Sequence, residues 1–404
     1  MKKTKGKDMK RFVALLLSVM MVCCLFTGCA KTEAPAEKAE EPAAAPAEEV
    51  VEAPAEEAAP AEEEAAGRDL AELKIGAFSN STKTDGGYTQ AFNTALETIK
   101  ANYGLKDDQI ILVENVYDGT PDVQNIVQQL INEGCNVIIG HSNGYNEDMD
   151  VFAQKHDDIQ FYCYEGLTSD KITTYSVNNQ EAIYLLGYLC AKVSAGDEIG
   201  FIAPMQNSHI IRSVDAFALG AKRANENATV RVMWVNSWWD PETDKLCAET
   251  LMSEGINTMA YYGSTSAALQ ACEANGAFCT GFHIDMQSYA PKAVLSSFVW
   301  NWVPLLTEMV ERYIAEDNSR EMIIGGLEMD CARIAPLNAD IIDAEIIADV
   351  EALQAQIASG EVDVFAGPVY DNQGNLVIEE GATLSEEDLF SVMYLVDNVI
   401  GSVE

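Results

Sequence analysis

The stretch LKIGAFSNSTKTDGGYTQAFNTALETIKAN, residues 73–102, decides the fold. Its first six residues have the composition of a buried strand, and the turn Asp85-Gly86-Gly87-Tyr88 comes before the next periodic segment. Apolar side chains then recur at the spacing of an amphipathic helix over residues 89–102. A strand that leads through a turn into a helix is the repeating unit of a parallel α/β sheet.

The same unit recurs along the chain. We expect further strands at 110–116, 136–140, 159–164, 198–203, 230–235, 258–262 and 278–283. We expect further helices at 121–133, 147–155, 181–195, 209–225, 241–254 and 266–275. The two successive series have similar lengths and together exceed one comfortable core, which predicts two lobes. Each lobe should hold a parallel sheet flanked by helices.

The C-terminal part carries a weaker pattern. Residues 344–358 are predicted to form a helix, and Asp371-Asn372-Gln373-Gly374-Asn375 a hairpin turn. A last helix is expected at 385–400, packed back on the second lobe.

The N-terminus has the pattern of an export signal. A basic segment is followed by an apolar run, Phe12–Phe26, whose 15 residues fall short of a membrane span. The next residues, Phe26-Thr27-Gly28-Cys29, resemble the lipobox of bacterial lipoproteins. This resemblance implies a signal peptide at 1–28, lipid attachment at Cys29 and a position on the extracytoplasmic face of the cell membrane. An ordinary signal peptide with a chance cysteine is the alternative.

Residues 29–68 are predicted to be an anchor and a disordered linker. The segment 31–66 contains 12 Glu and 2 Lys and no aromatic residue. Such a composition cannot bury enough apolar surface to fold. Its expected role is to hold the folded part away from the membrane.

Charge and cysteine content exclude several classes of protein. The formal net charge is −39, of which −34 falls on residues 67–404, so nucleic acid is not expected as a partner. Seven cysteines follow residue 30 without a CxxC motif, and the four histidines are scattered, so we predict no metal site and no cofactor. A Cys272–Cys279 disulfide remains an open alternative.

Catalytic motifs are also missing from the sequence. There is no GxSxG, no HExxH and no cysteine beside a plausible histidine, so we assign no catalytic residue and expect no enzyme. Asp85 and Asp285, one from each lobe, could form an acid/base pair in a lipid-anchored hydrolase, the enzymatic alternative.

Polar and aromatic residues follow the predicted strands where a ligand should bind, at the carboxyl ends of the sheets. They are rich in aromatic, carboxylate and amide groups and poor in Arg and Lys, a mixture suited to a planar heterocycle. Trp238 and Trp239 are adjacent, and one of the two should face the cleft. The predicted ligand-binding residues are Asp85, Tyr88, Asn143, Tyr145, Glu165, Trp238, Trp239, Asp285 and Trp300.

Four sequence blocks in order resemble the basic membrane protein family of ABC-transporter substrate-binding lipoproteins. The blocks are Lys74-Ile75-Gly76 with Asp85-Gly86-Gly87-Tyr88, residues 212–221, Ser237-Trp238-Trp239-Asp240-Pro241, and residues 283–302. The resemblance implies the two-lobed periplasmic-binding-protein fold of type I, with a hinge between the lobes and a purine base or nucleoside as ligand. It also implies ABC permease subunits as partners and a monomer in solution. A binding protein that serves a membrane sensor kinase, or one for another small polar solute, would have the same lobes.

The resemblance further assigns roles to single residues. It implies that Trp238 stacks on the base, that Asp85 accepts from base N–H groups and that Asp285 binds ribose. Nucleoside-binding members have a Lys where this chain has Trp300. We therefore expect a purine base such as adenine rather than a nucleoside.

The lobe boundaries follow from the expected chain crossings. We place the first lobe at 69–177 plus 296–322, and the second at 178–295 plus 323–404. Crossings are expected near 177/178, 295/296 and 323, and a bound ligand should favour the closed form that the permease recognises.

Overall fold

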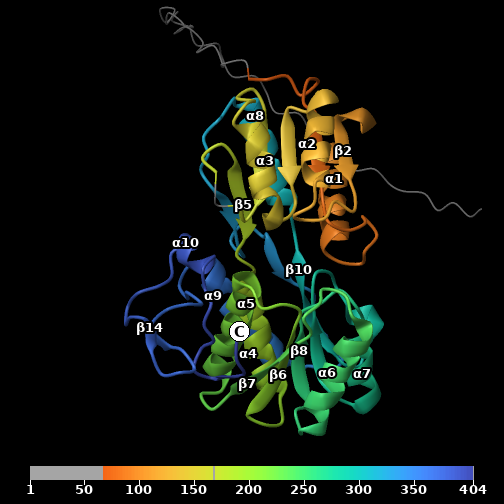
Figure 1. Cartoon of the computed structure of the whole chain (residues 1–404). Helices are drawn as coiled ribbons and strands as arrows, with labels where there is room; N and C mark the ends of the chain where they lie inside the picture. Colours follow the sequence, from red (N-terminus) through yellow and green to blue (C-terminus); the bar gives the residue numbers. More distant parts are fainter. Residues whose placement is uncertain (1–66, 167–168, 404) are drawn as a thin grey trace, which may run out of the picture. The chain divides into compact units, whose positions relative to one another are not determined.

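The strands form two large sheets and one small hairpin, joined largely by helices (Figure 1). The computed structural model describes residues 67–166 and 169–403. The predicted signal peptide 1–28, Cys29 and the linker up to residue 66 lie outside the described residues. Among the described residues, no helix combines the length and the apolar character needed to cross a bilayer.

The first sheet has six strands in the order β11-β5-β4-β3-β1-β2, all parallel. Its strands are β1 Ile75–Phe78, β2 Ile110–Val113, β3 Val137–Gly140, β4 Gln160–Tyr164, β5 Thr173–Val177 and β11 Ile323–Gly325. The helices of this lobe are α1 Tyr88–Tyr103, α2 Asp122–Asn132, α3 Asn146–Ala153 and α8 Val303–Ile314. Strands β1, β3, β4 and β5 are fully buried, as expected for a parallel sheet covered on both faces.

The second sheet has seven strands in the order β12-β10-β9-β8-β6-β7-β15, parallel except for β12. Its strands are β6 Glu198–Ala203, β7 Thr229–Trp234, β8 Thr258–Tyr261, β9 Phe278–Gly281, β10 Val294–Trp300, β12 Ala332–Ile334 and β15 Val399–Ile400. The helices of this lobe are α4 Asn179–Val193, α5 Ser208–Ala224, α6 Pro241–Ser253, α7 Ala267–Asn275, α9 Ala344–Ala358 and α10 Glu386–Leu389. The described residues of both lobes belong to one compact unit.

Helices α4 and α5 approach each other backbone to backbone at two glycines. A Cβ atom on Gly220 would lie 2.0 Å from the Tyr184 carbonyl oxygen, and one on Gly187 would lie 2.0 Å from the Phe217 carbonyl oxygen. Only glycine, which has no Cβ atom, fits at these two positions. The close packing fixes α5, whose first turn faces the space between the lobes.

Three segments connect the lobes, and they are hydrogen-bonded to one another. The Asn178 N–H donates to the Gly325 carbonyl at 3.0 Å, and the Asn301 N–H donates to the Cys331 carbonyl at 2.9 Å. The crossing at 177/178 agrees with the prediction. The other two predicted crossings are corrected, because β10 stays paired in the second sheet to Trp300 and β11 belongs to the first sheet. The buried pair Ser296 and Ser297 interrupts the apolar run of β10, but the strand continues through it to Trp300.

Most predicted elements are confirmed within a few residues, including the hairpin of β13 Val369–Tyr370 and β14 Leu376–Ile378. The helix predicted at 385–400 is wrong. Only α10 forms there, and the chain then extends to β15, which pairs with β7. Long-range hydrogen bonds explain the difference, because the Val396 N–H donates to the buried Asp215 and the Asn398 amide donates to the Ala218 and Ala228 carbonyls. The seven cysteines of the described residues are buried free thiols, Cys272 and Cys279 included.

Candidate functional site

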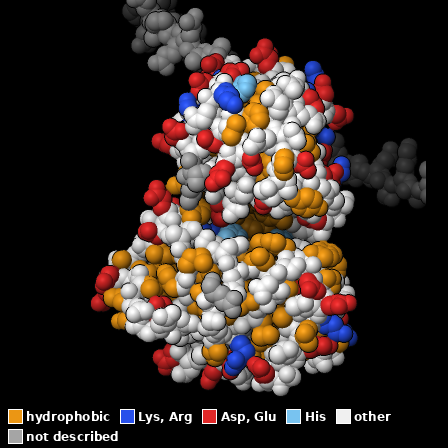
Figure 2. All heavy atoms as spheres, in the orientation of Figure 1, with side chains coloured by type: hydrophobic (Ala, Val, Ile, Leu, Met, Phe, Trp, Pro, Cys, Tyr) orange, Lys and Arg blue, Asp and Glu red, His pale blue; other side chains and the backbone are white. Residues whose placement is uncertain are grey.

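A cavity of about 430 Å³ lies between the two lobes, within the range of small-molecule sites. The first lobe contributes Asn80, Ser81, Asp85, Tyr88, Asn115, Tyr117, Ser142, Asn143, Tyr164 and Glu165. The second contributes Asn207, His209, Trp238, Trp239, Tyr262, Ser264, His283 and Trp300. Figure 2 shows the recess between the lobes, with hydrophobic and histidine side chains along it. Among the described residues, the lining contains two carboxylates and neither Lys nor Arg, so it does not suit a phosphorylated ligand.

The structure places seven of the nine predicted ligand-binding residues in this lining and leaves two outside. The Tyr145 ring is buried against Phe78, and its hydroxyl donates to the Val116 carbonyl. Asp285 is exposed, and its carboxylate accepts from the Gln287 N–H at 3.0 Å. Neither Tyr145 nor Asp285 lines the cavity. The chain turns at His283, which has a φ of 73°, so that His283 and not Asp285 enters the cavity after β9.

Asp85 caps helix α1 from the edge of the cavity. Its Oδ1 accepts from the N–H groups of Gly87 at 2.8 Å and Gln90 at 3.0 Å, and its Oδ2 accepts from Thr89 at 3.1 Å. A carboxylate at this position satisfies backbone donors that the helix leaves unpaired and complements its dipole. The proposed contact of Asp85 with a ligand stays a prediction, since both carboxylate oxygens already accept.

Tyr88 stands at the centre of an aromatic cluster beneath the cavity. Its ring stacks on His141 at 4.2 Å, and His141 stacks on Phe92 at 3.7 Å. Trp300 and Trp302 meet the Tyr88 ring edge-on at 5.8 and 5.6 Å. The buried Tyr88 hydroxyl makes no hydrogen bond to any described residue. Burial, and then the neighbouring tyrosines and Glu165, raise its pKa well above the ordinary value, so the hydroxyl stays a neutral donor.

Trp238 and Trp239 lie in the loop between β7 and α6 and remain 49% and 61% exposed. Both line the cavity, although alternation of adjacent side chains predicted that only one would. The loop is fixed by Asp240, whose side chain accepts from the Thr243 N–H at 3.1 Å and caps α6. Tyr117, 58% exposed, lines the cavity from the first lobe. Exposed indoles in a cavity wall are available to stack on a flat ligand.

Trp300 and His283 form a fixed pair in the cavity wall. The Trp300 indole N–H donates to His283 Nδ1 at 2.8 Å. Burial lowers the pKa of His283 to about 4, although the nearby Asp85 charge works in the opposite direction. His283 is therefore neutral near pH 7, and because Nδ1 accepts, its proton is on Nε2. Next to Trp300, which stands where nucleoside-binding members have a Lys, the wall therefore offers the neutral Nε2–H donor of His283.

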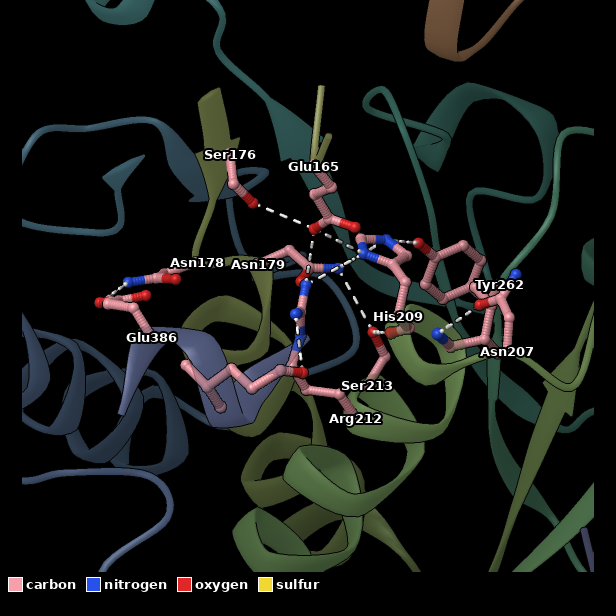
Figure 3. A network of polar contacts seen from close by, with 12 residues as sticks. Glu165, Ser176, Asn178, Asn179, Asn207, His209, Arg212, Ser213, Tyr262 and Glu386 are labelled. Carbon is pink, nitrogen blue, oxygen red and sulfur yellow. Dashed lines mark hydrogen bonds and ion pairs between the residues drawn. The ribbon is translucent and has the colours of Figure 1, made fainter. Parts of the chain in front are cut away.

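Glu165 carries the strongest polar contacts of the site (Figure 3). Its Oε1 accepts from Arg212 Nη2 at 3.0 Å and from the Ser176 hydroxyl at 3.0 Å, and it lies 3.2 Å from His209 Nδ1. His209 and Arg212 belong to α5 of the second lobe, whereas Glu165 follows β4 of the first. Burial by itself raises the pKa of the Glu165 carboxyl, but the charges of His209 and Arg212 outweigh it and hold the pKa well below its usual range. Glu165 is thus a buried, ionised acceptor that joins the two lobes.

Several lining residues were absent from the prediction. They are Asn80, Ser81, Asn115, Tyr117, Ser142, Tyr164, Asn207, His209, Tyr262, Ser264 and His283. Most follow a strand end, the signal that selected the other candidates, and Tyr164 is the last residue of β4. Application of the same rule after β2 would have found Tyr117. Tyr262 and His283 were missed because the predicted strands 258–262 and 278–283 included them, whereas β8 ends at Tyr261 and β9 at Gly281. His209 carried no such signal, because it lies inside a helix.

Two lobes of parallel α/β sheet, three connecting segments and a cavity between the lobes define the class of two-lobed periplasmic binding proteins. Residues 72–366 match the family model described as Bmp, ABC transporter substrate-binding protein PnrA-like, and the chain belongs to this family. It is an ABC transporter substrate-binding protein, a family whose members bind a small solute and act with permease subunits.

Relatives and solved structures agree with this assignment. The chain is 26% identical over 329 residues to a purine-binding protein of Brucella abortus, across 81% of this chain and 93% of the relative. It is 27% identical over 273 residues to a putative ABC transporter glucose-binding protein of Haloferax volcanii, across 67% and 70%. A solute-binding protein of an ABC transporter system from Conexibacter woesei shares the fold, with a TM-score of 0.62 and 18% identity across 72% of this chain and 98% of that one.

Proposed function

We propose that the protein binds a purine base of the adenine type in the cavity between its lobes and delivers it to an ABC importer. The carrying observation is the chemistry of the cavity wall, in which exposed indoles and a tyrosine surround neutral donors and carboxylate acceptors, with neither Lys nor Arg among the described lining residues. The resemblance to a purine-binding relative supports the ligand class. Trp238 stacks on the ring, the Tyr88 hydroxyl and His283 Nε2 donate, and Glu165 accepts from a ligand N–H.

The preference for a free base rests on Trp300. Stacking of a base on an aromatic side chain requires only the flat face of the base and no particular hydrogen-bonding group. A ribose, in contrast, requires hydrogen-bonding groups around its hydroxyls, and Asp285, the residue assigned to that role, is exposed outside the cavity lining. The indole N–H of Trp300 is already committed to His283. The wall at this point is therefore better suited to exclude a sugar than to bind one.

Calorimetric titration of residues 67–404 with adenine, adenosine, glucose and AMP tests this function. Adenine is expected to bind at least as tightly as adenosine, and Trp300→Lys should shift the preference toward the nucleoside. AMP should not bind, since its phosphate would meet an anionic lining. Tight adenosine binding with weak adenine binding would refute the base preference, and selective glucose binding would refute the purine class.

We further propose that the mature protein begins at Cys29 and is held on the extracytoplasmic face of the membrane by lipid on that residue. The lipobox-like Phe26-Thr27-Gly28-Cys29 supports this placement. Cys29→Ala should release the protein from the membrane fraction or leave the signal peptide uncleaved. Membrane association of the mutant at the mature mass would contradict the anchor.

A further inference from the structure

Arg212 is a buried cation outside the cavity lining that touches a residue of the lining. Its side chain is 2% exposed. Nη2 donates to Glu165 Oε1 at 3.0 Å, and Nη1 donates to the Leu389 carbonyl at 3.1 Å. The guanidinium also lies over the Phe390 ring, 5.4 Å from its centroid. Arg212 therefore connects the ligand cavity with the C-terminal segment (Figure 3).

This C-terminal segment lies beyond the part of the chain that defines the family. The family model ends at residue 366, whereas Leu389 and Phe390 follow it by more than twenty positions. The same segment reaches the first connection between the lobes, where Glu386 accepts from the Asn178 side-chain amide at 3.2 Å. It is held down by the bonds of Val396 and Asn398 to α5 and its flank. Residues beyond the part of the chain that the family model covers therefore help to position the Arg212 guanidinium.

Glu165 needs such a partner. Its backbone has a φ of 50°, an unfavourable conformation for a residue other than glycine, which turns the side chain toward the second lobe. A buried carboxylate without a counter-charge is costly and tends to take up a proton. Ser176, His209 and Arg212 all contact Oε1, so Oε2 makes none of these three bonds. Oε1 is therefore anchored, and Glu165 itself belongs to the cavity lining.

We propose that Arg212, itself fixed by Leu389 and Phe390, is a positioning residue that orients Glu165 as an ionised acceptor for a ligand N–H. The inference rests on the proposed function, because it assigns Glu165 to the same ligand. An ionised carboxylate accepts but does not donate. The arrangement therefore selects ligands that present an N–H or O–H group at this point and disfavours those that present a carbonyl.

A double-mutant cycle with adenine as the probe tests the proposal. Arg212→Met should weaken adenine binding at least about tenfold, and Arg212→Lys should recover part of that loss. In a Glu165→Gln background, Arg212→Met should cause no further loss, because the carboxylate that it orients is gone. The matched control is Arg231→Met, since Arg231 pairs with Glu198 and Glu254 in the second lobe and does not line the cavity. It should bind adenine like the unsubstituted protein.

The outcomes separate this inference from the proposed function. If Arg212→Met weakens adenine binding equally with Glu165 or Gln at position 165, Arg212 has only a structural role and the inference is wrong. If the unsubstituted protein does not bind adenine, the proposed function fails instead. In that case the effects of Arg212→Met and Glu165→Gln on the free energy of unfolding of the ligand-free protein are measured in urea, singly and together. If the two effects are additive, Arg212 does not position Glu165.

Discussion

Removal of the Tyr88 hydroxyl should have opposite effects on stability and on ligand binding. It is buried and has no hydrogen-bond partner among the described residues, whereas its ring packs on His141, Trp300 and Trp302. Tyr88→Phe keeps the ring contacts and removes only the unpaired hydroxyl. In the ligand-free protein this should raise the free energy of unfolding, because an unsatisfied buried polar group costs about 1–3 kcal/mol. In the complex it should weaken binding, because the ligand is expected to supply the missing partner.

The magnitudes follow from the same hydroxyl. A gain of about 1 kcal/mol corresponds to a rise in Tm of roughly 2 °C for a domain of this size. Loss of one neutral hydrogen bond to adenine, about 0.5–1.5 kcal/mol, should weaken binding by roughly 2- to 13-fold. Differential scanning calorimetry of the ligand-free protein and calorimetric titration with adenine measure the two effects independently.

Tyr175→Phe is the matched control. The Tyr175 hydroxyl is buried 2.7 Å from His141 Nδ1, and the residue does not line the cavity. Its loss should lower stability by about 1–3 kcal/mol and leave adenine affinity unchanged. The reasoning is refuted if Tyr88→Phe destabilises the ligand-free protein while adenine binds as before.

Three further changes test the site, the helix packing and the ionisation of a buried carboxyl group. Trp238→Ala should weaken adenine binding by roughly 5- to 150-fold in calorimetric titration, since base–aromatic stacking is worth about 1–3 kcal/mol, and an unchanged affinity would remove Trp238 from the site. Gly220→Ala should lower the free energy of unfolding in urea by about 1–3 kcal/mol or more, because its Cβ would meet the Tyr184 carbonyl oxygen; equal stability would show that α4 and α5 separate easily. Burial raises the pKa of Glu181 to about 7, so the folded state favours its neutral form. Stability should thus fall as pH rises from about 4 through 7, and Glu181→Gln should remove that loss of up to about 3 kcal/mol at pH 8 while it changes little at pH 4.

The alternation of strands and helices was predictable because it depends on local patterns. The run Ile75–Phe78, the turn at Gly86 and the periodic face of α1 are each readable without any partner. Strand β5 was missed, because Thr173–Val177 is more polar than its neighbours, and its burial comes from the sheet around it. The segment 390–400 has helical spacing, yet it forms turns and the short strand β15, because hydrogen bonds through Asp215 and Asn398 hold it to α5.

The sequence by itself determined the family resemblance, the two lobes and seven of the cavity residues, because strand ends meet at one edge of a parallel sheet. Only the tertiary structure decided that His283 replaces Asp285 in the cavity and that Asp85 caps a helix. The φ of 73° at His283 turns this side chain toward the cavity and leaves Asp285 outside it, and the amino-acid sequence around His283 does not predict this backbone angle. The pairing of Glu165 with Arg212 is likewise a tertiary fact. It joins residues 47 positions apart in different lobes, and a buried ion pair depends on geometry that local sequence does not carry.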